Sequence, residues 1–142
     1  MLKRLVIVSG YFNPLHKGHL DYFEKSKLLG DELLVIVNND IQRELKNSKF
    51  FQDEKERLRI ISSLKLVNHT FLSVDKDRTV VESIKRVHSL YSKNYDIMFT
   101  NGGDQFFCES PEKEICDRLG ITIRDGLGEK IQSSSWLLSN ND

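Results

Sequence analysis

Two histidines, His16 and His19, are the residues of this chain best placed to do chemistry. They follow a continuous apolar run, Leu5 to Val8, which predicts a parallel strand buried on both faces. After a turn that contains Pro14, apolar residues recur at helical spacing, so the pair stands where a strand passes into a helix. The first-turn amides of such a helix attract phosphate. Two imidazoles there could bind phosphate oxygens and stabilise charge that develops on them.

Polar residues also follow two further predicted strands. Leu33 to Val37 predicts a second buried strand, and Asp40 comes shortly after it. Because the carboxyl ends of parallel strands line the edge where ligands bind, Asp40 is a candidate for the same cleft; the alternative is that it caps the next helix. A fourth strand, Asp96 to Thr100, runs into Gly103 and Asp104. Glycine lets a ligand approach the backbone closely, and the aspartate can accept hydrogen bonds from a base or sugar.

Two other stretches could meet phosphate. The polar, basic loop from Lys46 to Lys49 leads into a charged helix expected from Asp53 to Leu66. Exposed lysines are usually solvated, so the loop alone assigns no function. Near the C-terminus, residues 133–135 are three serines ahead of an apolar helical turn. Serines in that position ordinarily cap a helix, but their hydroxyls and amides also suit a phosphate.

The remaining elements must position these groups. We expect a third strand over Val67 to Val74, a helix over Val80 to Tyr91 that Asp77 or Thr79 could cap, a helix from Pro111 to Leu119 with Gly120 as its stop, and a fifth strand over Ile121 to Ile123. Strands alternate with helices five times. This predicts an α/β fold, in which residues 1–142 form a single domain around a Rossmann-like, doubly wound parallel sheet of about five strands.

Composition narrows the class of protein. The 142 residues include 21 Lys and Arg and 21 Asp and Glu, and this balance argues against general nucleic-acid affinity. Cys108 and Cys116 are not spaced as a zinc site, so we expect reduced structural thiols and no metal-ligating residues. The apolar run near the N-terminus is too short for a signal peptide, and no stretch is long enough for a membrane span. We expect a cytoplasmic protein with no membrane or nucleic-acid partner.

One segment resembles a known signature. The residues concerned are Gly10, Phe12, Asn13, Pro14, His16, Gly18 and His19. They resemble the HxGH motif of the nucleotidyltransferase superfamily that includes the cytidylyltransferases, many of which have Asp where this chain has Asn13. The Gly-Gly-Asp turn and the serine cluster are also similar to that family, so the resemblance covers nearly the whole chain. It implies an enzyme that transfers a nucleotidyl group from a nucleoside triphosphate to a phosphorylated small molecule and releases pyrophosphate.

The resemblance also implies roles for individual residues. The catalytic set is His16 and His19 at the pentacoordinate phosphorus, with Lys46 and Arg57 on the triphosphate. Asp40 and Lys46 are implied to bind the acceptor substrate. Nucleotide contacts are implied for Gly10, Tyr11, Phe12, Asn13, Gly18, Gly103, Asp104, Ser133, Ser134 and Ser135. The acceptor phosphate would attack the α-phosphorus in line, with no covalent enzyme intermediate.

Substrate identity is left open by the resemblance. We expect CTP ahead of ATP, with glycerol 3-phosphate or a sugar phosphate as the acceptor, since similar cytidylyltransferases use these. Heptose-phosphate adenylyltransferase and archaeal FAD synthase, which are built on the same motifs, use ATP instead. The family further implies Mg²⁺ bound largely through nucleotide phosphates, and a homodimer. The alternative from another class is a non-catalytic nucleotide-binding regulatory module, against which the histidine pair, basic loop and serine cluster argue together.

Overall fold

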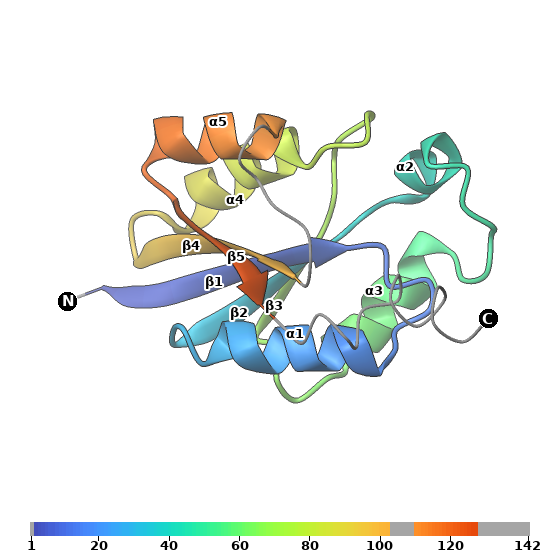
Figure 1. The fold of residues 1–142 in the computed structure, drawn as a ribbon, viewed down its shortest axis with the longest axis horizontal. Coiled ribbons are helices and arrows are strands. Elements are labelled where there is room, and N and C mark those ends of the chain that lie inside the picture. The colour runs from blue at the N-terminus through green and yellow to red at the C-terminus, as the bar shows by residue number, and fades with distance from the viewer. Residues whose placement is uncertain (1, 103–109, 128–142) are drawn as a thin grey trace.

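The computed structural model of the chain describes residues 2–102 and 110–127. Five strands form one sheet in the order β3-β2-β1-β4-β5, and all neighbouring pairs are parallel. The strands are β1 (Lys3–Gly10), β2 (Glu32–Val37), β3 (His69–Leu72), β4 (Tyr95–Gly102) and β5 (Thr122–Leu127). The predicted five-stranded, Rossmann-like parallel sheet is therefore confirmed (Figure 1).

Helices cover both faces of the sheet, as a doubly wound fold requires (Figure 1). α1 (Lys17–Lys27) and α3 (Glu54–Ser62) lie on one face, and α4 (Val81–Tyr91) and α5 (Pro111–Leu119) lie on the other. The short helix α2 (Asp40–Leu45) follows β2 almost directly and lies beyond the carboxyl end of that strand. α2 is thus placed beside the edge where ligands bind in such sheets.

The apolar run of β1 serves both faces because successive side chains of a strand point to opposite sides. Leu5 and Ile7 pack in the cluster that contains α4 and α5, whereas Val6 and Val8 pack in the cluster that contains α1 and α3. All four side chains are fully buried. Each contributes about 1.5–3 kcal/mol by leaving water. This packing fixes the end of β1, from which the histidine-bearing turn begins.

The strand order reverses at the centre of the sheet. From β1 the chain passes outward to β2 and β3, and it then returns to place β4 on the other side of β1. The crevice beyond the carboxyl ends of β1 and β4 is therefore the topological switch point, where open α/β sheets bind ligands. The loop after β1 leads from this point into the start of α1, where the histidine pair lies.

The ends of α5 agree with the sequence-based prediction. Pro111 opens the helix, and the side chain of Ser110 accepts a hydrogen bond from the backbone N–H of Lys113. Gly120 ends it in the left-handed conformation, with φ at 73°. Glycine adopts that conformation without a Cβ clash, so Gly120 ends the helix for the predicted reason.

The start of α4 differs from prediction. We expected Asp77 or Thr79 to cap this helix. The Thr79 hydroxyl accepts from the N–H of Val81 at 3.4 Å, but the next two amides are bound by Asp75. The Asp75 carboxylate accepts from the N–H of Glu82 at 2.7 Å and from that of Ser83 at 3.0 Å. Asp77 accepts from Thr79 within its own turn. The buried carboxylate of Asp75, which follows β3, reaches two amides at once, which a residue of the exposed turn does not.

Candidate active site

His16 and His19 form a stacked pair at the start of α1. Their ring centroids are 3.8 Å apart, and the ring planes make an angle of 29°. His16 is the N-cap residue: its Nδ1 accepts from the N–H of Gly18 at 3.0 Å, while Nδ1 of His19 accepts from the N–H of His16 at 3.1 Å. This reciprocal capping box fixes both rings at the junction where the sequence placed them.

The hydrogen bonds determine which ring nitrogens carry protons. Because Nδ1 of each ring accepts from a backbone N–H, the neutral rings hold their proton on Nε2. Burial lowers the pKa of His16. Burial, then the nearby charges of His16 and Lys46, lower the pKa of His19 to about 4. At neutral pH the pair therefore consists of two uncharged Nε2–H donors, which can bind phosphate oxygens without repelling each other.

A pH-dependent stability follows from His19. Histidine in the unfolded chain titrates near 6.5, so between about pH 6.5 and 4 the unfolded state binds a proton that the folded state does not. The free energy of unfolding should therefore fall as pH drops through this window, by on the order of 2 kcal/mol from His19, and the effect should level off below it. Asparagine keeps an acceptor near the His16 amide but does not titrate. Urea unfolding of His19→Asn between pH 7 and pH 4.5 should show a shallower loss than the parent, and parallel curves would contradict the assignment.

Phe12 packs against the histidine pair from the core side. Its ring meets His19 edge-on at 5.0 Å and Phe23 at 5.2 Å between centroids. The Phe12 backbone has φ at 53°, a region that non-glycine residues adopt rarely, and its side chain is buried. A Cβ on Gly10 would lie 2.8 Å from the Phe12 ring, so glycine is needed there. Gly10 and Phe12 thus support the pair, and their predicted contact with nucleotide stays a prediction.

Asn13 joins the histidine-bearing turn to the basic loop. Its side-chain amide donates to the carbonyl of Lys49 at 2.9 Å and accepts from the N–H of Gln52 at 3.0 Å. An aspartate, which many family members have here, could accept the second bond but could not donate the first. The structure therefore gives the Asn13 side chain a positioning role, and its predicted contact with the nucleotide stays a prediction.

Arg57 is placed differently from the prediction. Its side chain is fully buried, and its Nη1 donates to the carbonyls of Tyr11 at 2.8 Å and Asn38 at 2.6 Å. Nε donates to the carbonyl of Gln52 at 3.0 Å, and Nη2 contacts Asp40 Oδ1 at 2.8 Å. These contacts hold the loops around the site together, so the structure gives Arg57 a positioning role. Its predicted contact with the triphosphate stays a prediction.

Asp40 shares this positioning role. Besides pairing with Arg57, it accepts from the N–H of Glu54 at 3.1 Å, and its own N–H donates to Glu54 Oε1 at 2.9 Å. The carboxylate thus ties α2 to the start of α3. Asp40 does not cap α2, because the N-cap of that helix is Asn39. Its predicted contact with the acceptor substrate stays a prediction.

Lys46 lies at the C-terminal end of α2 and approaches the pair. Its Nζ is 4.4 Å from the centroid of the Tyr11 ring, within cation–π range. The residue is exposed overall, but partial desolvation of the ammonium, followed by repulsion from Arg78, lowers its pKa. Lys46 is also close enough to influence the pKa of His19. The structure therefore brings together the histidine pair, Tyr11 and Lys46.

Arg78 and Gln42 were missed in the sequence. Arg78 is exposed on the turn after β3, and its charge acts on Tyr11 and Lys46. Gln42 is fully buried in α2 and holds that turn. Signals for both existed: Arg78 follows the carboxyl end of a strand, as Asp40 does, and Asn39 with Gln42 has the spacing of a capping box.

The remaining predicted site residues lie at the start of α1 and after the end of β4. Gly18 lies in the first turn of α1 and donates its N–H to His16. The predicted residues Gly103, Asp104, Ser133, Ser134 and Ser135 lie outside the described residues. Before them, Gly102 ends β4 against α1: a Cβ there would lie 3.2 Å from the Tyr22 ring. The end of β4 is thus closely packed where the predicted Gly-Gly-Asp turn begins.

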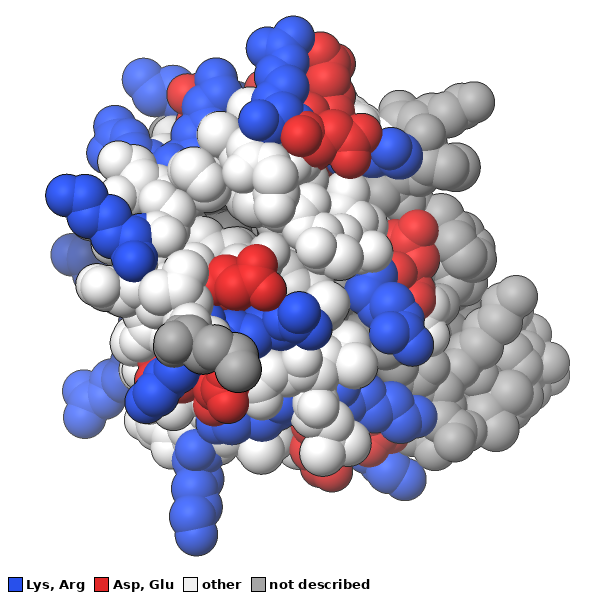
Figure 2. Space-filling model, turned by 90° about the vertical axis from the view of Figure 1, so that its left-hand side faces the viewer, with Lys and Arg blue, Asp and Glu red and all other residues white. Residues whose placement is uncertain are grey.

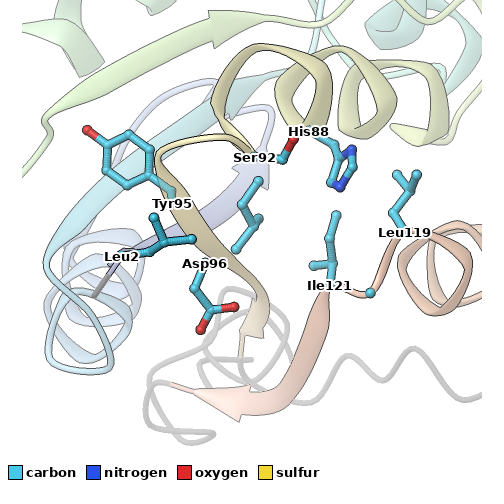
Figure 3. A pocket seen from close by; sticks show the side chains of 9 residues that line it. Leu2, His88, Ser92, Tyr95, Asp96, Leu119 and Ile121 are labelled. Atoms are coloured by element: carbon cyan, nitrogen blue, oxygen red, sulfur yellow. The ribbon is translucent and has the colours of Figure 1, made fainter.

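A hollow of about 340 Å³ lies at the opposite end of the sheet (Figure 3). His88 from α4, Tyr95 and Asp96 from the start of β4, and Ile121 before β5 are among its lining residues. These mark the amino ends of the strands, so the hollow is separate from the histidine pair. Figure 2 views this end, where Lys, Arg, Asp and Glu side chains of the described residues are interspersed.

The expectations on membrane spans, metal ligands and cysteines can be compared with the described residues. None of the described helices combines the length and apolar character needed to cross a membrane. Within residues 2–102 and 110–127, no three His, Cys, Asp or Glu side chains are grouped so as to hold a metal ion. Cys116 is a buried free thiol whose pKa is raised to about 12, first by burial and then by Asp117 and Glu112. Cys108 lies outside the described residues.

Comparison with known proteins gives a consistent set of relatives. A family model described as cytidylyltransferase-like matches residues 7–126. The FAD synthase of Thermoplasma acidophilum is 34% identical over 121 residues, which are 84% of this chain and 78% of that protein. The FAD synthase of Thermoplasma volcanium is 35% identical over the same shares of the two chains. That of Methanolacinia petrolearia is 39% identical over 82% of this chain and 70% of its own.

Two solved structures have a fold similar to that of this chain. A lipopolysaccharide core biosynthesis protein from Thermoplasma volcanium superposes with a TM-score of 0.73 at 31% identity, covering 89% of this chain and 98% of that chain. A NadR protein in complex with NR gives a TM-score of 0.60 at 20% identity, covering 96% of this chain and 38% of the other. The second match shows the fold alone.

Proposed function

Because this chain belongs to the cytidylyltransferase-like family of nucleotidyltransferases, we propose that it transfers the adenylyl group of ATP to flavin mononucleotide. The observation that carries the proposal is the match to FAD synthases at 34% and 35% identity over 84% of the chain. It favours ATP, which was our alternative, over CTP with glycerol 3-phosphate or a sugar phosphate. The product would be FAD, in which an AMP unit is joined to FMN.

The reaction requires that the two reactants be positioned and that the negative charge on their phosphates be neutralised. A phosphate oxygen of FMN attacks the α-phosphorus of ATP, and the bond from that phosphorus to the β-bridging oxygen breaks. Pyrophosphate leaves with the bonding electrons. Since a phosphate monoester is already ionised at neutral pH, the attack requires no general base. The protein contributes by holding two anionic reactants in line and by stabilising the charge on the oxygens of the α-phosphate.

The histidine pair suits the second task. His16 and His19 carry Nε2–H donors at the switch point of the sheet, where the helix dipole of α1 also favours an anion. We assign both donors to the α-phosphate, and Lys46 to the neighbouring phosphate groups of ATP and of the acceptor. Neutral donors, unlike imidazolium groups, are present throughout the neutral pH range. Asp40, Asn13 and Arg57 position these loops.

Magnesium and oligomeric state remain part of the proposal. A divalent ion on the triphosphate would neutralise negative charge, and Mg²⁺ typically binds such substrates through phosphate oxygens and water. We propose that it is bound in that way here. The homodimer implied by the family resemblance stays a prediction, which sedimentation at micromolar concentration would test.

The direct test is product formation from matched substrates. We expect FAD and pyrophosphate from ATP with FMN, at least tenfold less product with CTP, and none with riboflavin, which lacks the attacking phosphate. Chromatography of the flavins and a pyrophosphate assay would measure both products. A His19→Asn preparation purified in parallel controls for contaminating activity. Turnover of CTP with glycerol 3-phosphate, and none of ATP with FMN, would overturn the proposal.

A further inference from the structure

Gln42 connects α2 to the turn that carries Arg78. Its side-chain nitrogen donates to the carbonyl of Asp77 at 2.8 Å and to that of Thr79 at 2.7 Å, and these residues flank Arg78. Asn39 adds a third bond, from its side chain to the carbonyl of Asp75 at 2.9 Å. Figure 1 shows the turn after β3 and α2 together beyond the carboxyl ends of the strands. The exposed Arg78 therefore lies on a turn that is fixed by the buried side-chain amides of Asn39 and Gln42.

The same glutamine also locates Lys46 and Tyr11. The backbone carbonyl of Gln42 accepts from the N–H of Lys46 at 3.0 Å and, at a longer 3.4 Å, from the hydroxyl of Tyr11. The Lys46 ammonium then lies over the Tyr11 ring. Three groups from separate parts of the chain therefore share one anchor: the loop after β1, the end of α2 and the turn after β3.

The two cations in this cluster lack a carboxylate partner among the described residues. The salt bridges there occupy Arg43 and Arg57, not Lys46 or Arg78. Asp77, next to Arg78, accepts instead from the backbone and hydroxyl of Thr79. Repulsion between the two cations is second to desolvation in lowering the pKa of Lys46. Two cations that are anchored by the same glutamine and have no carboxylate partner among the described residues can bind an anion.

We propose that Arg78, together with Lys46, binds the phosphate of the acceptor, and that Gln42 positions Arg78 for this task. The inference rests on the proposed function and names the residue that recognises its phosphorylated acceptor. Arg78 lies on the turn after β3, and β3 is on the side of β1 away from β4. An acceptor held there approaches the α-phosphate from the β2 and β3 side, and the planar guanidinium suits a bidentate phosphate contact.

FMN and riboflavin differ by this phosphate alone, so their relative affinity reports on the subsite. Flavin fluorescence titrations should show that the parent prefers FMN and that Arg78→Gln loses this preference by about 10- to 100-fold, with riboflavin binding unchanged. In turnover the variant should raise the KM for FMN and leave that for ATP within about twofold. Arg86→Gln, the same change at an exposed position on α4, should match the parent in each measurement.

Gln42→Glu tests the positioning role. A carboxylate would face the two carbonyls that the amide now serves, so the variant should lower the FMN preference and should add little to Arg78→Gln in the double variant. A structural effect alone would add fully. If Gln42→Glu fails to fold, the Arg78→Gln titration still decides.

The outcomes separate this inference from the proposed function. If the parent makes FAD but Arg78→Gln keeps the full preference for FMN, the subsite is wrong and the function stands. If the parent neither binds nor adenylylates FMN, the proposed function is wrong. The subsite is then judged by the broadening of the ³¹P signal of inorganic phosphate, which Arg78→Gln should reduce severalfold. Equal broadening in the parent and the variant would overturn it.

Discussion

His16→Asn and His19→Asn should each lower kcat by about 10²–10³-fold while leaving the affinity for ATP within a few-fold of the parent. Removal of one preorganised donor to developing charge typically has an effect of this size. The Nε2–H groups act mainly on charge that forms in the transition state, so ground-state binding should be less affected. Single-turnover rates and calorimetric titration with a non-hydrolysable ATP analogue would separate the two quantities.

Asparagine is the informative replacement because each histidine also has a structural hydrogen bond. Nδ1 of His16 caps α1, and asparagine is among the best N-cap residues, so His16→Asn keeps the cap and removes only the outer donor. His16→Ala loses both, and should cost about 1 kcal/mol of stability in addition. His88→Asn, in the hollow at the far end of the sheet, is the matched control and should retain parental kcat. Turnover within a few-fold of the parent in both active-site variants would refute the catalytic assignment.

The sheet and most helices were predictable because their signals are local. Leu5 to Val8 and Leu33 to Val37 are continuous apolar runs, and such runs occur where a parallel strand is covered on both faces. Pro111 and Gly120 mark the ends of α5 through backbone restrictions that need no tertiary context. The start of α4 was predicted only in part, since two of its amides are bound by the carboxylate of Asp75, which precedes them by 7 and 8 residues.

The histidine pair was also predicted in the right place, but its protonation was not. That depends on burial, on the cap geometry and on the nearby His16 and Lys46, all of which are three-dimensional. Arg57 shows the same limit more strongly. In the sequence it heads a charged helix and is expected to face solvent or phosphate. Only the fold shows that carbonyls from three loops converge on its guanidinium.

Arg57→Ala should destabilise the protein by about 3–5 kcal/mol, the largest stability effect that we expect from a single substitution in the site. The change would leave Asp40 without its closest cation, and it would remove the Arg57 donor from one buried and two partly buried carbonyls. Breaking one partner of a buried ion pair typically has this cost, because the remaining charge stays desolvated. Arg57→Lys should fall between the parent and alanine, since an ammonium cannot reproduce the planar fork.

The matched control is Arg59→Ala, two residues along α3. Arg59 is exposed and its side chain has no hydrogen bond among the described contacts, so its loss should change stability by no more than about 0.5 kcal/mol. Urea unfolding without ligand measures both variants. The triphosphate-binding role that the family resemblance implied for Arg57 makes the opposite prediction: unchanged stability, and weaker binding of ATP with AMP unaffected. If Arg57→Ala unfolds at the parental urea concentration and loses only ATP affinity, the positioning role is wrong. A large loss of stability, with Arg59→Ala near the parent, would place Arg57 in the framework that holds the loop after β1 against α2 and α3.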